Sequence, residues 1–152
     1  MTVYESLARW LNGLLAEGGD DGIPEGTEAV TDAGAIPSLA ADFPGIGAVE
    51  AGLYGNPGDR SVDLLGGHVR RTEHRTWYVA RRFGEFEDRR SNERFVEAVR
   101  NRIRRAALRG DMPGDGRRWR RIEVSGGMFP SSRSADGRRA VYQIPLRIEY
   151  VE

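Results

Sequence analysis

The sequence predicts a small α+β domain, with a mixed, mainly antiparallel sheet that carries two helices packed on one face. Residues 3–16 and 92–108 have apolar side chains at the spacing of amphipathic helices, and residues 140–151 alternate as a half-buried strand does. The elements follow one another as helix, strands, helix and hairpin. We expect the 152 residues, 1–152, to form a single domain, because this length buries a normal core without staples.

Residues 140–151, AVYQIPLRIEYV, form the strand around which the fold is organised. Every second residue from Tyr142 to Tyr150 is apolar, so one face of the strand should be buried. The opposite face is mixed and suits solvent or another subunit. It contains Pro145, which has no N–H to donate to a ladder and is usually confined to an edge strand or a bulge. The sequence therefore predicts a border strand.

Both predicted helices have local start or stop signals. The first covers about residues 3–16, begins with Thr2 and Glu5 in capping-box spacing, and has Trp10 beside its stripe, where we expect it to complete the core. The second has Ser91 as its N-cap and Gly110 as its stop. Its buried stripe comprises Phe95, Val96, Val99, Ile103 and Ala106.

Strands and loops account for the rest of the chain. We expect short strands at residues 48–54 and 61–65, with Gly66 and Gly67 ending the second, and a long strand or bent pair at residues 69–83. A strand centred on Ile122 and Val124 should pair with the last strand as an antiparallel hairpin, with residues 130–139 as a polar loop. Residues 18–47 lack periodicity and predict a long acidic loop.

Composition excludes several classes of site. The chain has no cysteine, so disulfides and thiolate metal sites are excluded. No apolar run approaches the roughly 20 residues of a membrane span, and the N-terminus lacks a signal peptide's basic start and apolar core. We therefore expect a soluble chain of intracellular origin. All 23 basic residues are arginine, which we attribute to a GC-rich genome.

The net charge of zero conceals a division along the chain. Residues 1–59 contain ten acidic residues and one basic residue, Arg9, a net charge of −9, which leaves +9 for residues 60–152. Opposite charges on two parts of one chain favour head-to-tail contacts between copies.

Catalytic and metal-binding patterns are missing from the sequence. His68 and His74 are the only histidines. They lack a third ligand for zinc, because Glu73 should point to the opposite side of the strand, and we expect surface histidines. Asp20 and Asp21 lack the alternating oxygen ligands of a calcium loop. Nucleophile-elbow and dinucleotide-binding motifs are also missing. We expect no metal, no cofactor and no enzymatic activity.

Several segments resemble the tail terminator proteins of long-tailed phages, a family that includes proteins described as phage minor capsid proteins. The similar segments are YESLARWLNGLL at the start, the helix from Phe95, Met112-Pro113 where the family often has Leu-Pro, IEVSGGMF, and YQIPLRIEYVE at the end. They cover about two-thirds of the chain and are packing patterns without chemistry. The acidic segment and the all-arginine chemistry depart from the family.

The resemblance implies a small α/β fold that assembles as a ring, commonly a hexamer, on the last ring of the tail tube. The ring stops tube polymerisation and presents a surface to the head connector or stopper protein. The implied partners are copies of the chain, the tail tube protein and the connector, while DNA passes through the lumen without specific binding. The implied location is the head-proximal end of the virion tail, and the host cytoplasm during assembly.

Within such a ring, we expect arginines and apolar residues at the subunit or tube interface: Arg70, Arg71, Arg100, Arg104, Met128, Phe129, Arg133 and Arg147. Acidic residues should face the lumen and repel phosphate: Asp20, Asp21, Glu25 and Glu28. We further expect Ile144→Asp to unfold the domain. Arg147→Glu should leave it folded and weaken the ring.

Two other functions stay open at this point. The first is another joining protein of the virion, a head–tail connector or tail completion protein. The second is an arginine-rich nucleic-acid-binding module that uses the second helix, whose polar face carries Arg94, Arg100, Arg102, Arg104, Arg105 and Arg109. The salt dependence of DNA binding separates this module from an assembly protein.

Overall fold

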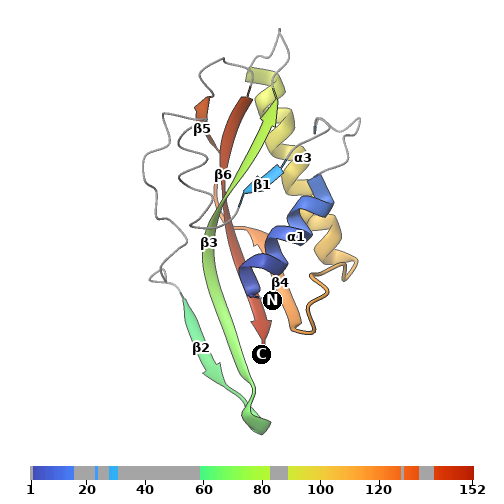
Figure 1. Cartoon of the computed structure of the whole chain (residues 1–152), viewed down its shortest axis with the longest axis vertical. Helices are drawn as coiled ribbons and strands as arrows, with labels where there is room; N and C mark the ends of the chain where they lie inside the picture. Colours follow the sequence, from blue (N-terminus) through green and yellow to red (C-terminus); the bar gives the residue numbers. More distant parts are fainter. Residues whose placement is uncertain are drawn as a thin grey trace.

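Two long antiparallel strands, β3 (Val69–Arg82) and β6 (Arg139–Val151), lie side by side along the protein (Figure 1). The computed structural model describes residues 2–15, 23, 28–30, 59–82, 89–127, 129–133 and 139–152. The other elements are α1 (Val3–Leu15), β1 (Glu28–Val30), β2 (Arg60–Asp63), the 3-10 turn η1 (Leu65–Gly67), α3 (Arg89–Leu108), β4 (Arg118–Val124) and β5 (Phe129–Arg133). All described strand pairs are antiparallel, and the α+β class is confirmed.

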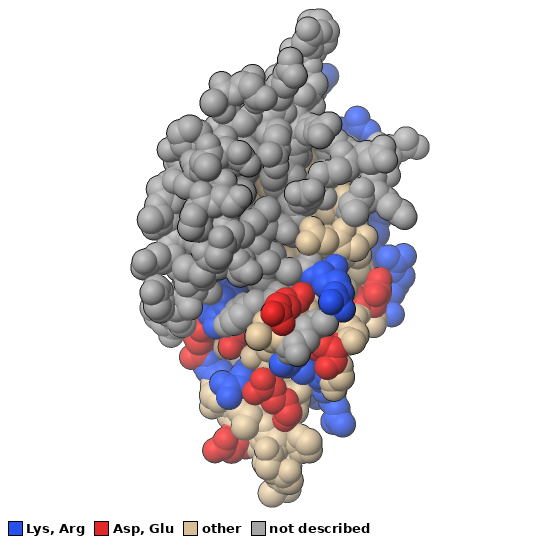
Figure 2. Space-filling model, in the orientation of Figure 1, with Lys and Arg blue, Asp and Glu red and all other residues tan. Residues whose placement is uncertain are grey.

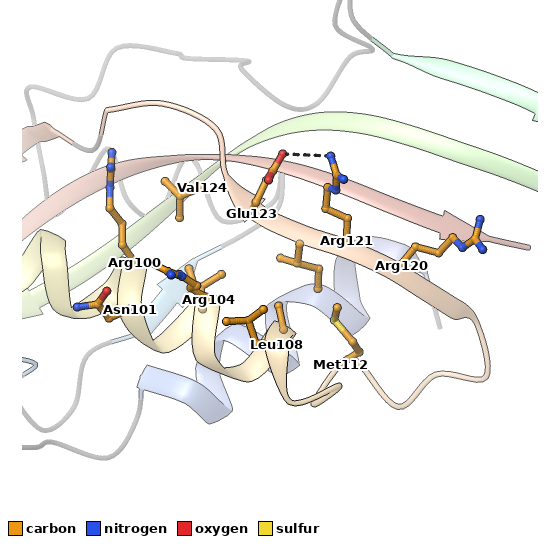
Figure 3. Close-up of a pocket in the computed structure, with 12 residues that line it drawn as sticks. Arg100, Asn101, Arg104, Leu108, Met112, Arg120, Arg121, Glu123 and Val124 are labelled. Carbon is orange, nitrogen blue, oxygen red and sulfur yellow. Dashed lines mark ion pairs between the residues drawn. The ribbon is translucent and has the colours of Figure 1, made fainter.

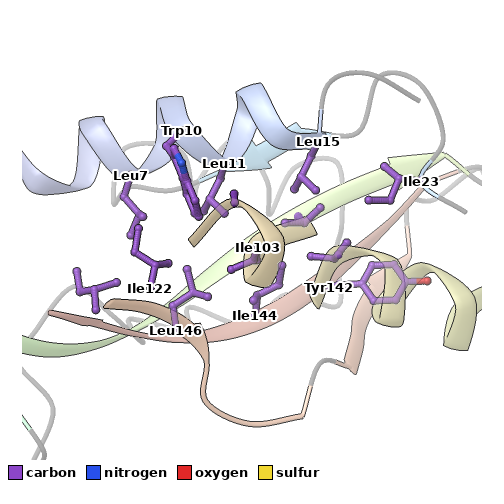
Figure 4. Packing of buried hydrophobic residues seen from close by; sticks show 14 of the residues in the cluster. Leu7, Trp10, Leu11, Leu15, Ile23, Ile103, Ile122, Tyr142, Ile144 and Leu146 are labelled. Carbon is purple, nitrogen blue, oxygen red and sulfur yellow. The ribbon is translucent and has the colours of Figure 1, made fainter. Parts of the chain in front are cut away.

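Both helices cover the same face of the sheet, and the core fills the space between (Figures 1 and 4). The apolar positions of β6 are buried, from Tyr142 to Tyr150, as the alternation predicts. The stripe of α1 contributes Leu7, Leu11 and Leu15, and that of α3 contributes Phe95, Val99 and Ile103. The ring of Phe95 lies 4.7 Å from that of Tyr142, centroid to centroid. The hydrophobic pattern therefore predicted the layers correctly.

The start of α1 has the predicted capping box. The Thr2 backbone N–H donates to Glu5 Oε2 at 2.8 Å, and the Glu5 N–H donates to Thr2 Oγ1 at 3.1 Å. Trp10 is buried, as expected, and its Nε1–H donates to the Asp111 carbonyl at 2.9 Å, which satisfies its one polar atom.

The end of α3 is also as predicted, but its start is not. Gly110 has a φ of 72°, and the Asp111 N–H donates to the Ala106 carbonyl at 2.9 Å, the pattern of a Schellman motif. The helix begins at Arg89, so Ser91 lies inside its first turn and is not the N-cap. A serine can occupy either place, and the sequence alone does not separate them.

The border-strand prediction for β6 is wrong. β6 lies between β3 on one side and β4 and β5 on the other. Pro145 falls where β4 has ended and β5 has not begun, and its carbonyl accepts the Ser125 N–H at 2.9 Å. Backbone N–H and C=O groups of one strand residue point to the same side, so the missing N–H of Pro145 faces this break. A proline at residue 145 is therefore compatible with a central place for β6 in the sheet.

Two predicted loops contain strands. Residues 129–133 form β5, which pairs with β6, so residues 130–133 of the expected polar loop at 130–139 are strand, Arg139 begins β6, and residues 134–138 lie outside the described residues. Glu28–Val30 form β1 on β3, and Ile23 is buried, both within the segment expected as an acidic loop. The strand expected at residues 61–65 is β2, Arg60–Asp63. The strand expected at residues 48–54 lies outside the described residues.

Candidate functional site

Exposed apolar side chains gather at two places on the surface. Among the described residues, four large hydrophobic side chains are exposed: Val62 at 42%, Leu64 at 37%, Leu65 at 98% and Leu108 at 76%. Val62 lies at the end of β2, and Leu64 and Leu65 lie on the connection to β3; we name residues 62–67 the hairpin tip. Leu108 ends α3. Single exposed apolar residues are ordinary, but a group on one protruding turn indicates a contact surface.

The hairpin tip is held in a defined position by its backbone. Gly66 and Gly67 have φ values of 81° and 79°, which other residues rarely adopt, and they turn the chain from β2 into β3. The Leu64 N–H donates to the His68 carbonyl at 2.8 Å and closes the turn. Below it, Val69 and Glu152 exchange two backbone hydrogen bonds. These contacts leave Leu65 exposed on an ordered turn.

Figures 1 and 2, in one orientation, show what the hairpin tip presents. It lies at the lower end of the molecule in Figure 1, beyond the ends of the helices. The same end in Figure 2 is tan, with acidic atoms beside it. Asp63, next to Leu64, is exposed. The tip is therefore an apolar surface with a negative charge at its side.

A groove of about 560 Å³ lies between α3 and β4 (Figure 3). We name it the α3–β4 groove. Helix side chains form one wall: Arg100, Asn101, Ile103, Arg104, Ala107 and Leu108. The chain from Met112 and strand residues Arg120, Arg121, Ile122, Glu123 and Val124 form the rest. Ile103 and Ile122 are buried, so the floor is apolar and the polar groups stand at the rim.

Local turns shape this groove. The Schellman motif at Gly110 turns the chain away from α3, and the segment that follows returns it to β4. At the far end, Arg100 Nη2 donates to the Gly126 carbonyl at 2.5 Å and ties the helix to the residues after β4. Gly126 approaches Pro145 so closely that an added Cβ would lie 3.3 Å from Pro145 Cγ. The groove is thus fixed at both ends.

The rim of the groove is positively charged. Arg100, Arg104 and Arg120 stand around it, while Arg121 and Glu123 alternate with the buried Ile122 and point to the other side of β4 (Figure 3). Arg121 pairs with Glu123 at 3.8 Å, while Arg104 and Arg120 are exposed and take part in none of the ion pairs within the described part of the chain. A surface ion pair of that length neutralises little. The groove suits an apolar group accompanied by a negative charge.

A second group of charges has a structural explanation. The Arg75 side chain is 7% exposed, and its Nη1 lies 2.9 Å from Asp59 Oδ2 while its Nη2 lies 3.4 Å from Glu73 Oε1. A buried guanidinium needs such partners. Two carboxylates engaged by one buried arginine do not make an acid–base pair open to substrate.

The two histidines do not form a metal site. His68 directly follows the hairpin tip, and its Nδ1 is 3.1 Å from the Glu152 carbonyl, while His74 lies farther along β3 beside Asp59. Among the described residues, no three His, Cys, Asp or Glu side chains are grouped to hold a metal ion.

The predicted interface residues fall on separate surfaces. Arg100 and Arg104 meet at the groove. Arg70 and Arg71 lie at the start of β3, where Arg71 Nε is 2.9 Å from Glu152 Oε2, and Arg147 lies on β6, 3.7 Å from Glu123. Phe129 and Arg133 are in β5, and Glu28 is in β1. Met128, Asp20, Asp21 and Glu25 lie outside the described residues.

The hairpin tip was missed by the sequence interpretation, which assigned Leu64 and Leu65 to a strand. Two leucines directly before two glycines were the available signal, because a Gly-Gly turn exposes the residues beside it. Comparison of the chain with family models, curated proteins and solved structures finds no match in any of the three. No described helix combines the length and apolar character of a membrane span.

Proposed function

We propose that this protein is a non-enzymatic structural protein of a virion, a ring-forming tail terminator that caps the tail tube, stops its polymerisation and joins the tail to the head connector. The observation that carries the proposal is that one chain presents two different exposed surfaces, a protruding apolar tip and an arginine-rimmed groove. Two different surfaces that fit each other produce heterologous contacts, which close into rings when the rotation allows.

Two further features support the tail terminator among ring-forming proteins. Of the segments that resemble the family, IEVSGGMF includes the end of β4 and YQIPLRIEYVE includes most of β6, and these two strands are neighbours in the sheet. The resemblance therefore concerns neighbouring parts of one sheet rather than unrelated short segments. The other is the charge division of −9 and +9 along the chain, which suits head-to-tail contacts.

One other class is favoured by a specific observation. The exposed arginines of α3, among them Arg94, Arg100, Arg104 and Arg105, would suit a nucleic-acid-binding module. However, Arg102 of the same helix is directed to protein, since its Nη1 donates to the Leu14 carbonyl at the end of α1 at 2.8 Å. The connector and tail completion functions share the assembly role and differ only in partner.

The test measures mass in solution and the effect on tube growth. Multi-angle light scattering of the full chain should give a ring, with six chain masses as the expected value, alone or after mixing with the tail tube protein of the same virus. Substoichiometric amounts should shorten tubes seen by negative-stain microscopy. A strict monomer that joins neither tube nor connector would contradict the proposal.

A further inference from the structure

We infer that the hairpin tip of one copy inserts into the α3–β4 groove of the next copy, and that this contact closes the ring. The inference rests on the proposed function for the ring, and it adds the two surfaces that make it. The four exposed large hydrophobic side chains of the described residues all belong to these two surfaces, three to the tip and Leu108 to the groove. Joining the surfaces covers all four at once.

The apolar parts are suited to each other in chemistry. In the tip, Leu65 is 98% exposed, Val62 42% and Leu64 37%. The groove has a floor that includes Ile103, Ile122 and Val124 and a volume of about 560 Å³. Burial of apolar surface contributes roughly 25 cal/mol for each Å² removed from water, so an exposed leucine that enters this floor drives association.

The charged parts also match. Asp63 stands beside the leucines of the tip, and the groove rim holds Arg104 and Arg120, which have no ion-pair partner among the described residues. Insertion of the tip brings the carboxylate to these guanidinium groups. Electrostatic complementarity of this kind fixes the register of a contact and excludes a reversed one.

A chain does not satisfy its own groove. Its tip leucines instead line a second hollow of about 320 Å³, together with His68, Gly116, Arg118, Arg120 and the end of β6, so Arg120 borders both this hollow and the groove. The tip is anchored there through Val69 and Glu152, whose backbone N–H and C=O groups pair at 3.3 Å and 2.9 Å. A second copy can supply the occupant, since its tip carries the exposed Leu65 for the apolar lining and Asp63 for the rim arginines.

The first experiment compares matched variants of the full chain by light scattering. Leu65→Asp alters the tip and Arg104→Glu the groove, with Ser61→Asp and Arg105→Glu as controls, since both control residues are exposed and lie outside the two surfaces. We expect each test variant to weaken self-association by at least about tenfold and each control to leave it within about twofold. Circular dichroism melts confirm that all four fold.

The second experiment tests the direction of the contact. A mixture of Leu65→Asp and Arg104→Glu chains contains one intact tip and one intact groove, so it should form a 1:1 pair and no ring. Asp63→Arg as a single change should weaken the ring. The double variant Asp63→Arg with Arg104→Glu should restore it, because the two charges are again opposite.

The outcomes separate this inference from the proposed function. Wild-type rings that persist in both test variants would overturn the tip–groove contact and leave the ring function standing. A wild type that stops at a dimer, and that Leu65→Asp dissociates, would support the contact and contradict the ring. A mixture that forms no pair from two dissociated variants would overturn the contact.

Discussion

The clearest polar anchor among single residues is Asp115. Its side chain is 2% exposed and accepts hydrogen bonds from Trp119 Nε1 at 2.8 Å, from the Arg117 N–H at 3.0 Å and from Arg117 Nη1 at 2.6 Å. Gly116, with a φ of 82°, lets the chain turn back onto this carboxylate. Asp115 thereby holds the turn that leads into β4, one wall of the α3–β4 groove.

These contacts make Asp115 a source of pH-dependent stability. Burial raises the pKa of its carboxyl, but the hydrogen bonds from Trp119 and Arg117 outweigh burial and lower the pKa from 3.8 to about 2. A depressed pKa stabilises the fold above the unfolded value near 4, and that stability is lost as the pH falls from about 4 to 2.

We predict that Asp115→Asn lowers the free energy of unfolding by about 2 kcal/mol at pH 6, since one pKa unit corresponds to about 1.4 kcal/mol. The difference from wild type should shrink when urea denaturation is repeated at pH 3. A difference that stays constant between the two pH values would show that the carboxylate's charge is not the cause.

At the scale of helices and strands, the sequence predicts correctly those features that depend on residues close together in the chain. The capping box of Thr2 and Glu5 and the stop at Gly110 are correct because each depends on residues within one or two turns. The position of Pro145 in the sheet depends on where β4 ends and β5 begins, more than ten residues earlier. No local pattern contains that information, and the edge prediction failed for this reason.

The candidate site divides in the same way. Arg100 and Arg104 are among the residues expected at the subunit or tube interface of a ring, and the structure places both in the lining of the α3–β4 groove. The groove itself depends on how α3 meets β4, which periodicity does not specify. The sequence pattern assigns Leu65 to a strand because an apolar pair is usually interpreted as buried. Its exposure depends on the turn at Gly66 and Gly67, which that pattern does not specify.

Because β6 lies inside the sheet, substitutions on its two faces should affect stability very differently. Ile144 is fully buried, so Ile144→Asp places an unpaired carboxylate in the core and should cost more than about 4 kcal/mol, enough to abolish a cooperative melt. The Arg147 side chain is 40% exposed, and its ion pair with Glu123 is long, at 3.7 Å. Arg147→Glu should therefore lower the free energy of unfolding by less than about 1 kcal/mol.

Arg147→Glu should also leave the oligomer intact, because the border contact first expected for β6 is occupied by β4 and β5 of the same chain. Thermal melts followed by circular dichroism and light scattering measure both effects. Loss of the ring in a folded Arg147→Glu chain would place a subunit contact on the face of the sheet opposite the helices instead.

At the scale of the whole molecule, the distribution of charge separates assembly from nucleic-acid binding. Residues 60–152 carry a net charge of +9, and they supply Arg100, Arg104 and Arg120 at the rim of the groove. In a ring held by the tip–groove contact, Arg104 and Arg120 face the Asp63 of a neighbour and are withdrawn from phosphate. In a nucleic-acid-binding module the same arginines bind phosphate, and affinity follows the salt concentration.

We predict little binding of the full chain to duplex DNA at either 50 mM or 200 mM salt by fluorescence anisotropy. A surface that neutralises several phosphates would lose affinity by orders of magnitude between these two concentrations, because bound counterions are released on association. Leu65→Asp, which frees the groove in the inferred contact, is the informative comparison: it should bind DNA more than wild type at low salt, since it exposes Arg104 and Arg120. Tight, steeply salt-dependent binding by wild type, unchanged in Leu65→Asp, would favour the nucleic-acid-binding module over the tail terminator.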